Sequence, residues 1–339
     1  MALPTTMRTL LQTSRESTAL ISTTSPLPTP THPDDVLVQV HATCPCAGEL
    51  LWARDFPNAI PASKVLIPCQ DLAGTVVSAP SGSGFAEEDR VYCRIDAGRP
   101  GAAREYALAR ATELAKIPEG LGWIEAAATP LSALTAWQAL FVHGTLNSKA
   151  VIGDEDTKKE NGRQRVLVTG AAGGVGSWLV QLAALAGAGA VVAVCGTNKV
   201  EAVRELGATE VINYQETTVE EWVAVDPAGR EVDLVVDVVG GKTLGGCWVG
   251  VKEGGTLISV NTPPDMVKPA GSEKKAKSSF FIVEPLGNNL AEIGDLIAAG
   301  KLRPTVDSVW EFDEFEKAFE RLESGHAKGK IVIKVSDQA

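Results

Sequence analysis

Short stretches of alternating apolar and polar residues fill the first third of the chain. Four of them are VLVQVHA at 36–42, GTVVSA at 74–79, DRVYCRI at 89–95 and REYALAR at 104–110. Proline and glycine residues separate the stretches. A period of two is typical of strands that bury one face, and short connections between such strands favour antiparallel pairing. The pattern therefore predicts a compact, mostly antiparallel β domain.

The spacing of apolar residues changes at Trp123. The segment IEAAATPLSALTAWQALFVHG carries alanine and leucine at helical spacing, which predicts a helix with a break at Pro130. From Arg165 onward, short apolar strands alternate with helical segments, in the order VLVTG, SWLVQLAALAG, AVVAV, KVEAVRELG, EVINY, VEEWV, DLVVDVVG and GTLISV. Repeated βαβ units of this kind build a parallel sheet with helices on both faces.

Two polar segments interrupt these patterns. GDEDTKKENGRQ at 153–164 and the lysine-rich stretch at 268–277 lack apolar periodicity, so both are predicted to be exposed loops. After the second come two helical patterns, LAEIGDLIAAG and FDEFEKAFERLES, and a closing strand, KIVIKV. A chain of 339 residues exceeds what one hydrophobic core usually serves. We therefore expect two domains, with the closing segment returning to the first.

A glycine-rich turn, GAAGGVG at 170–176, follows the strand VLVT and leads directly into an apolar helix. Gly173 lets the backbone approach a pyrophosphate, Gly176 lets the helix pack closely on the strand, and the helix N-terminus offers amides and a positive dipole. Ala171 takes the first fingerprint position, where glycine is usual. The alternative to dinucleotide binding is that these glycines serve only the geometry of the turn. Because strand, turn and helix occur in this order, we predict dinucleotide binding by Ala171, Gly173, Gly174, Val175 and Gly176.

Further motifs accompany this turn. They are LTAWQALF at 134–141, SWLVQLA at 177–183, ELGATEVINY at 205–214, GKLRPTVD at 300–307 and LESGHAKGKIVI at 322–333. With them the sequence resembles, over nearly its whole length, the medium-chain dehydrogenase/reductase superfamily and, within it, the zinc-free quinone oxidoreductase branch. The resemblance implies an α/β fold: a Rossmann doubly wound parallel sheet at 133–283, plus a GroES-like antiparallel β-barrel domain formed by 1–132 and 284–339. It also implies an active site in the cleft where the domains meet.

The same resemblance assigns the nicotinamide end of the cofactor. The residues implied are Thr135, Gly240, Asn261 and Phe281 to Val283. The protein would orient the cofactor and exclude water from the site, while the cofactor performs the chemistry.

The end of the second Rossmann strand predicts which cofactor is used. NAD-specific sites place an acid there for the ribose 2′-hydroxyl, about 20 residues past the glycine turn. Here AVVAV is followed by CGTNK, and the first acid is Glu201, inside the next helix. A 2′-phosphate would therefore meet no repulsion from an acid in this turn. Lys199 would supply a positive charge, and Gly196 and Thr197 would supply hydrogen-bond donors. The alternative is that Lys199 is an ordinary solvated lysine. The resemblance adds Tyr214 beside the same phosphate. We therefore predict NADPH rather than NADH.

The metal ligands of zinc alcohol dehydrogenases are largely missing. Cys46 falls at the first ligand position, but Gln70 replaces the histidine of the second, and the third region, around Pro130 to Ser132, offers no thiol. Cys44, Cys46, Cys69 and Asp71 are an alternative ligand set, against which we weigh the common use of cysteine as a small buried residue. We predict no metal.

Without a Lewis acid, alcohol oxidation is hard, whereas hydride transfer to a conjugated acceptor asks less of the protein. We predict reduction of a quinone or an α,β-unsaturated carbonyl. No proton donor is compelled: Tyr92, Tyr106 and Ser132 are candidates, although strand packing or helix capping is the favoured interpretation, and water is an alternative source. Trp52 either lines the acceptor pocket or anchors the barrel.

The net charge and the lengths of the apolar runs limit the kinds of partner that this protein can have. A net charge of −11 disfavours nucleic acid and anionic membranes. No apolar run is long enough to cross a membrane or to serve as a signal peptide, so we expect a cytoplasmic protein with reduced cysteines. The strand GTLISV, expected near the sheet edge, suggests a homodimer. Two other functions stay open: an enoyl-thioester reductase acting on CoA-bound or carrier-bound chains, and a noncatalytic NADPH-binding structural or regulatory protein.

Overall fold

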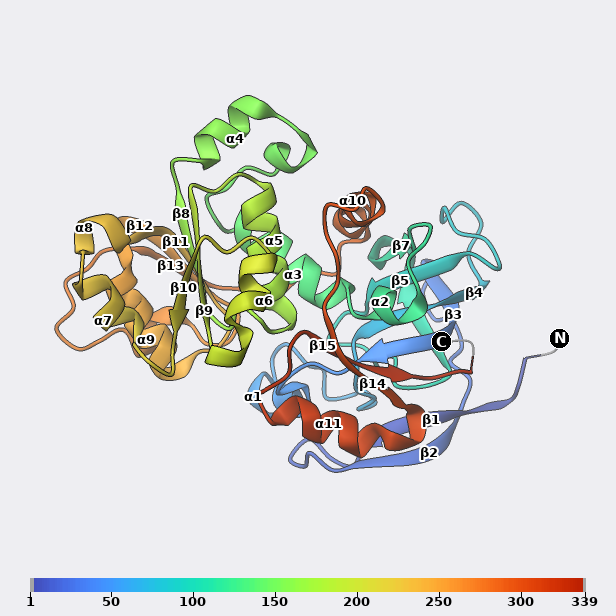
Figure 1. Cartoon of the computed structure of the whole chain (residues 1–339). Helices are drawn as coiled ribbons and strands as arrows, with labels where there is room; N and C mark the ends of the chain where they lie inside the picture. The colour runs from blue at the N-terminus through green and yellow to red at the C-terminus, as the bar shows by residue number, and fades with distance from the viewer. Residues whose placement is uncertain (1–2, 338–339) are drawn as a thin grey trace. The chain divides into compact units, whose positions relative to one another are not determined.

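The computed structural model describes residues 3–337, which fold as two units (Figure 1). The split unit is assembled from both ends of the chain, up to Leu134 and from Glu284 onward, and the central unit is Thr135–Val283. The first boundary falls inside helix α3 (Pro130–Phe141), two residues beyond the 132/133 boundary expected from the sequence. Among the described residues, no helix has the length and hydrophobicity needed to span a bilayer.

The split unit contains a seven-stranded sheet in the order β14-β15-β3-β4-β5-β7, with β6 paired to β3. Its strands are β3 (Asp35–Cys44), β4 (Asp71–Ser78), β5 (Arg90–Arg94), β6 (Tyr106–Arg110), β7 (Leu114–Lys116), β14 (Val306–Glu311) and β15 (Lys330–Lys334). All pairings are antiparallel except β14–β15, which is parallel because α11 (Phe315–Glu323) crosses between them. The predicted antiparallel β domain is confirmed, and β15 joins β3, so the chain ends in the sheet that its first third begins.

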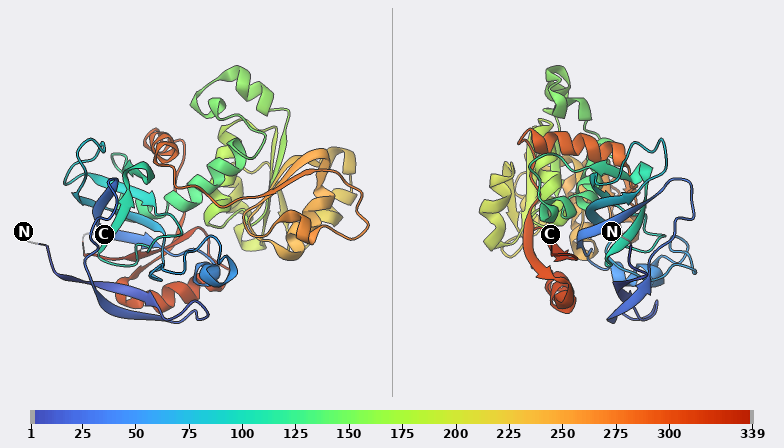
Figure 2. Two further views of the ribbon diagram at one scale, coloured as in Figure 1. Left: turned by 180° about the vertical axis from the view of Figure 1, so that it is seen from behind. Right: turned by 90° about the vertical axis from the view of Figure 1, so that its right-hand side faces the viewer.

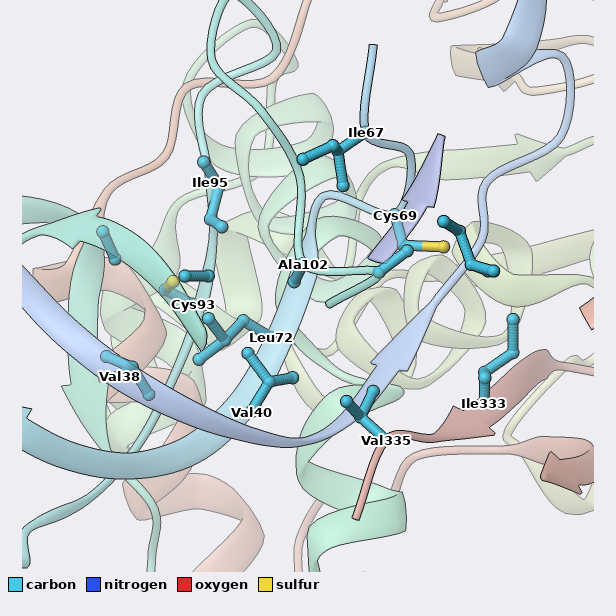
Figure 3. Packing of buried hydrophobic residues seen from close by; sticks show 14 of the residues in the cluster. Val38, Val40, Ile67, Cys69, Leu72, Cys93, Ile95, Ala102, Ile333 and Val335 are labelled. Carbon is cyan, nitrogen blue, oxygen red and sulfur yellow. The ribbon is translucent and has the colours of Figure 1, made fainter. Parts of the chain in front are cut away.

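Alternation in these strands directs one set of apolar side chains into a common core. Val38 and Val40 of β3 point into it with Leu72 of β4, Cys93 of β5 and Ile333 of β15 (Figure 3). The hairpin of β1 (Thr6–Gln12) and β2 (Leu20–Pro26), which the sequence patterns did not predict, lies beside α11 (Figures 1 and 2).

Short helices complete the split unit. They are α1 (Trp52–Asp55), α2 (Trp123–Ala127) and α10 (Gly287–Ala298), with 3₁₀ turns at Glu49–Leu51, Ala111–Glu113 and Phe312–Glu314. Helix α2 ends at Ala127, and α3 begins at Pro130. The predicted break at Pro130 is therefore confirmed, since proline suits the first turn of a helix but not its interior.

The central unit is built on a six-stranded parallel sheet in the order β10-β9-β8-β11-β12-β13. The strands are β8 (Arg165–Val168), β9 (Ala190–Cys195), β10 (Glu210–Asn213), β11 (Val232–Asp237), β12 (Val251–Ser259) and β13 (Lys277–Phe280). Figure 1 shows α5 (Gly174–Leu185) and α6 (Val200–Glu205) on one face of the sheet, and α7 (Val219–Ala224) and α9 (Gly241–Gly250) on the other. The predicted doubly wound α/β fold is confirmed.

Two local expectations need correction. The polar segment 153–164 is not a loop: it contains α4 (Glu155–Asn161), whose N-terminus is capped by Asp154. Asn161 anchors its end by donating to the carbonyls of Asn147 and Ala186 at 3.1 and 2.9 Å. Side-chain caps and one buried amide thus order a segment that has no apolar stripe.

The strand GTLISV lies near the end of the parallel sheet, as expected, but it is not the exposed edge. It is part of β12, which pairs with β11 on one side and with β13 on the other. Strand β13 follows the 3₁₀ turn at Pro264–Val267, and among the described residues it is the terminal strand on that side. The predicted homodimer stays a prediction, and strand pairing across a two-fold axis would use β13 rather than β12.

Candidate functional site

The glycine turn of the central unit brings the start of α5 against the end of β8. A Cβ atom added to Gly176 would lie 2.1 Å from the carbonyl oxygen of Gly170, closer than any side chain allows. Gly170 itself has a positive φ of 57°. Only glycine fits at 176, and no side chain caps the α5 N-terminus at Gly173. The turn therefore has the close backbone approach and the exposed helix start that a pyrophosphate needs.

The remaining residues of this turn are held by backbone contacts. The Ala171 amide donates to the Val194 carbonyl at 3.1 Å, which ties the turn to β9, and Ala171 is fully buried. An alanine methyl is thus accommodated at the first fingerprint position. Gly173, Gly174 and Val175 are partly exposed at the mouth of the turn.

The residues predicted to read the 2′ group come together after β9. Cys195 at the end of β9 is opposite Asn213 of β10, so the turn Thr197–Lys199 lies beside Tyr214. A Cβ added to Gly196 would lie 3.0 Å from the Tyr214 hydroxyl, and the Tyr214 side chain is 57 % exposed. Lys199 is half-buried at the start of α6. This region therefore contains the Tyr214 hydroxyl, the turn at 196–199 and Lys199 at the start of α6.

Glu201, the first acid after β9, lies inside α6 as expected. Glu201 binds Arg204 within α6 at 2.8 Å, and both side chains face solvent. However, the turn after β10 holds Gln215 and Glu216, which the sequence reasoning did not consider. The Glu216 carboxylate accepts from Asn213 Nδ2 at 2.6 Å, and Gln215 Oε1 accepts from the Thr197 amide at 2.9 Å. In the sequence, only their position directly after Ile212–Tyr214 could have pointed to these two residues.

Among the residues assigned to the nicotinamide, Gly240 and Asn261 are in contact with each other. Gly240, with a φ of 78°, approaches Asn261 so closely that an added Cβ would lie 2.2 Å from Asn261 Oδ1. The Phe281 ring stacks on His143 with 4.2 Å between ring centroids. Thr135 is buried in α3, and Val283, half-buried, is the last residue of the central unit.

A buried carboxylate that the sequence reasoning missed organises these turns. Asp237, at the end of β11, accepts from the Thr169 hydroxyl at 2.6 Å, the Gly240 amide at 2.8 Å and the Ser259 hydroxyl at 3.1 Å. It therefore links the carboxyl ends of β8, β11 and β12. Ligands of doubly wound sheets bind at this edge, where strand order reverses. An acid ending the apolar run DLVV was the signal for it.

The cysteines of the split unit do not form a metal site. Asp71 Oδ2 is 3.0 Å from Lys330 Nζ, and Asp71 Oδ1 accepts from the Leu131 amide at 2.6 Å. The same ammonium donates to the Pro45 carbonyl at 3.1 Å, so it is the cation next to Cys46. Within residues 3–337, no group of three or more His, Cys, Asp or Glu side chains is placed to hold a metal ion. The residues present do not fit a zinc site.

Burial and ion pairing set the charges within this cluster. Burial raises the pKa of the Cys46 thiol to about 12, so it carries no thiolate charge at neutral pH. Burial opposes a charge on Lys330, but the adjacent Asp71 carboxylate outweighs it and raises the pKa of Lys330 above its usual range. Gln70, at the predicted histidine position, can donate its amide to the carbonyls of Ile95 and Asp96 at 3.1 and 3.2 Å.

The three proton-donor candidates have structural settings. Tyr92 is buried, donates to the Leu290 carbonyl at 3.1 Å, and has its pKa raised by that burial. Tyr106 is half-buried in β6, and Ser132 is buried in α3. None of these positions marks a residue as a proton donor.

Trp52 lines a cavity of about 20 Å³ together with Glu49, Lys64 and Gln70. That volume suits one water molecule and not a quinone. Glu49, which the sequence reasoning missed, accepts from the amides of Cys46 and Cys69 at 3.3 and 3.0 Å, and burial raises its pKa to about 7. A larger cavity of about 660 Å³ lies between β7, α10 and the turn at 83–85, and no predicted cofactor residue lines it.

Comparisons with known proteins address the whole chain. A family model described as alcohol dehydrogenase GroES-like domain matches residues 32–119, and one described as zinc-binding dehydrogenase matches residues 206–333. A probable zinc-binding oxidoreductase, mitochondrial, of Arthroderma benhamiae is 43% identical over 94% of each chain. A chloroplast envelope quinone oxidoreductase homolog of Arabidopsis thaliana is 34% identical over 81% of each chain.

Two further proteins bear on the cofactor and the fold. The NAD(P)H oxidoreductase RTN4IP1, mitochondrial, of Danio rerio is 28% identical over 92% of this chain and 86% of its own length. The crystal structure of an alcohol dehydrogenase superfamily protein from Novosphingobium aromaticivorans superposes with a TM-score of 0.78 at 28% identity, covering 98% of this chain and 100% of that chain.

These names correct one expectation. We expected a cytoplasmic protein, but the Arthroderma and Danio relatives are both named mitochondrial, which contradicts that prediction. The prediction relied on apolar runs, which report on secretion and on membrane spans. Import into an organelle depends on other features, so those runs carry no information about it.

Proposed function

Because this chain belongs to the medium-chain dehydrogenase/reductase superfamily and is an oxidoreductase similar to quinone oxidoreductases, we propose that it is a zinc-independent reductase specific for NADPH. Its acceptor is a quinone or an α,β-unsaturated carbonyl. A nicotinamide cofactor is indicated by the NAD(P)H oxidoreductase relatives. We propose the preference for NADPH and the class of acceptor from the residues of this chain.

The observation that carries the proposal is the polar cluster after β9. Gly196, the Thr197–Lys199 turn and the Tyr214 hydroxyl share one small region, and Glu201 is paired with Arg204. A phosphate there would gain the charge of Lys199 and would meet no acid within the turn at 196–199. This supports NADPH over NADH.

The chain's residues bind and orient the cofactor along the carboxyl edge of the central sheet. The turn at 170–176 would hold the pyrophosphate, and Gly240, Asn261 and Phe281 would hold the nicotinamide end. When bound, the reduced nicotinamide supplies the hydride. A quinone, or an enone at its β carbon, would accept that hydride, and water would provide the proton that completes the reduction.

The same proposal excludes zinc, although the matching model and the Arthroderma relative carry zinc in their names. Support comes from the Asp71–Lys330 pair: the carboxylate of the alternative ligand set is already neutralised by a lysine of this chain. Without a metal, an acceptor activated by its own conjugation is the appropriate substrate.

The test is NADPH oxidation, followed by absorbance, with a panel of 1,2- and 1,4-quinones, 2-alkenals and crotonyl-CoA. We expect turnover with quinones or alkenals and little with NADH. Turnover confined to crotonyl-CoA would favour an enoyl-thioester reductase. Tight NADPH binding with no turnover on any acceptor would favour a noncatalytic structural or regulatory protein.

A further inference from the structure

Side chains of the turn after β10 hold the turn after β9. The Thr197 amide donates to Gln215 Oε1 at 2.9 Å, and the Thr197 hydroxyl accepts from Asn213 Nδ2 at 2.8 Å. Asn213 Oδ1 in turn accepts from the Gln215 amide at 3.2 Å. Both the backbone and the side chain of Thr197 are therefore committed to residues 213–215.

The Gln215 carboxamide oxygen lies within the region proposed for the 2′-phosphate. A Cβ added to Gly196 would be 3.4 Å from Gln215 Oε1 and 3.0 Å from the Tyr214 hydroxyl. This oxygen is an uncharged acceptor that binds the backbone N–H of Thr197. A phosphate oxygen seeks the same kind of donor, and backbone amides at turns commonly serve it.

We propose that Gln215 determines the cofactor's 2′ specificity by acting as a neutral stand-in for the phosphate. Its carboxamide oxygen takes the Thr197 amide when no nucleotide is bound and yields that amide to a phosphate oxygen of NADPH. The side chain is exposed and free to turn away. This inference rests on the NADPH preference proposed above and assigns it a residue.

The neutrality of Gln215 is what matters in this arrangement. A carboxylate at the same place would hold the Thr197 amide more strongly, because charge-assisted hydrogen bonds are shorter and stronger. It would also repel a phosphate that carries nearly two negative charges. The neighbouring acid, Glu216, has its carboxylate bound to Asn213 Nδ2 at 2.6 Å. Changing Gln215 to glutamate would thus add a charge that the existing network does not hold away from the site.

Binding of NADPH and NADH to the whole protein tests the inference without any need for turnover. In calorimetric titrations, Gln215→Glu should weaken NADPH by about ten- to a hundredfold, as expected for one like charge at the phosphate. NADH should stay within about twofold. The nearly isosteric Gln215→Met removes the competing acceptor, so NADPH affinity should be unchanged or a few-fold higher.

The matched control is Asn288→Asp, the same amide-to-carboxylate change at an exposed position of α10 in the split unit. It should alter neither affinity. A second measurement follows the Thr197 amide resonance in ¹⁵N-labelled protein. It should shift in Gln215→Met and should shift on adding NADPH, but much less on adding NADH.

The outcomes separate this inference from the proposed function. A wild type that binds NADH as tightly as NADPH overturns the NADPH preference and the role of Gln215 with it. A wild type that prefers NADPH, together with a Gln215→Glu variant that keeps the preference, overturns the role of Gln215 alone. A tenfold loss of NADPH affinity in Gln215→Met would likewise overturn it, because the side chain would then be a phosphate ligand and not a stand-in.

Discussion

Two regions of the molecule treat polar groups differently: the buried ion pair of the split unit and the carboxyl edge of the central sheet. In the split unit, Asp71 and Lys330 are buried together, and each neutralises the other. At the carboxyl edge of the central sheet, helix α5 begins without a side-chain cap, and Lys199 lies at the start of α6. A buried pair fixes structure because removing either partner leaves an isolated charge. Amides at an uncapped helix start cost little to leave to solvent, so they suit the exchangeable cofactor proposed above.

The strongest test of this contrast removes one buried charge. Lys330→Met should lower the free energy of unfolding by about 3–5 kcal/mol, because the Asp71 carboxylate is then left buried without its cation. Urea denaturation measures it. The control is Lys334→Met on the same strand, whose ammonium pairs with Glu311 at 3.2 Å near the surface, and it should cost about 0.5 kcal/mol. Equal losses in the two variants would show that burial of the pair does not matter.

A second buried polar group makes the split unit sensitive to pH. The His41 ring nitrogens contact the hydroxyls of Ser336 and Thr75 at 2.7 and 2.8 Å, and the ring packs on Trp123. Burial, with a smaller contribution from Arg90, lowers the pKa of His41 from 6.5 to about 4. The folded pKa lies below the unfolded one, so this stability is complete above pH 6.5 and is lost as the pH falls towards 4.

The loss attributable to His41 is about 3 kcal/mol between pH 7 and pH 4. Unfolding free energies at the two pH values, for wild type and His41→Gln, isolate it because other titrating groups cancel. His326→Gln, at an exposed position, should retain the full pH dependence of the wild type. If wild type and His41→Gln respond equally to pH, His41 is not the group that titrates.

The central unit should respond in binding rather than in stability. Lys199→Ala should weaken NADPH by about ten- to a hundredfold, since a charge-assisted contact contributes about 1.5–3 kcal/mol. NADH binding should barely change, and the midpoint of urea unfolding should stay the same. Lys159→Ala, which removes an exposed lysine of α4 in the same unit, is the control. Equal losses of affinity for NADPH and NADH would show that Lys199 does not contact the 2′-phosphate.

The smallest expected effect is that of chelation. Purified protein should contain well below one zinc per chain, and treatment with a chelator should leave NADPH oxidation unchanged, because Lys330 provides the cation beside Cys46. Elemental analysis decides the content. One zinc per chain, with activity lost on chelation, would overturn the zinc-free proposal.

The sequence by itself determined those features whose cause is local. Period-two alternation predicted β3 to β6, and the glycine turn predicted the β8–α5 connection, because strand faces and close backbone approaches are recorded in neighbouring residues. The turn residues at 196–199 were likewise available from the end of AVVAV. Glycine at 176 is required by a contact only six residues away.

Only the tertiary structure decided the features that join distant segments. The order in α4 depends on Asn161 reaching Ala186, and the stand-in role proposed for Gln215 depends on β9 and β10 being neighbours. The pairing of Asp71 with Lys330 requires β15 to return to the sheet of β3 and β4. Residue patterns report periodicity and burial, but not which remote side chains meet. That is set by the folding of the whole chain, so the partner of each buried charge could not be predicted in advance.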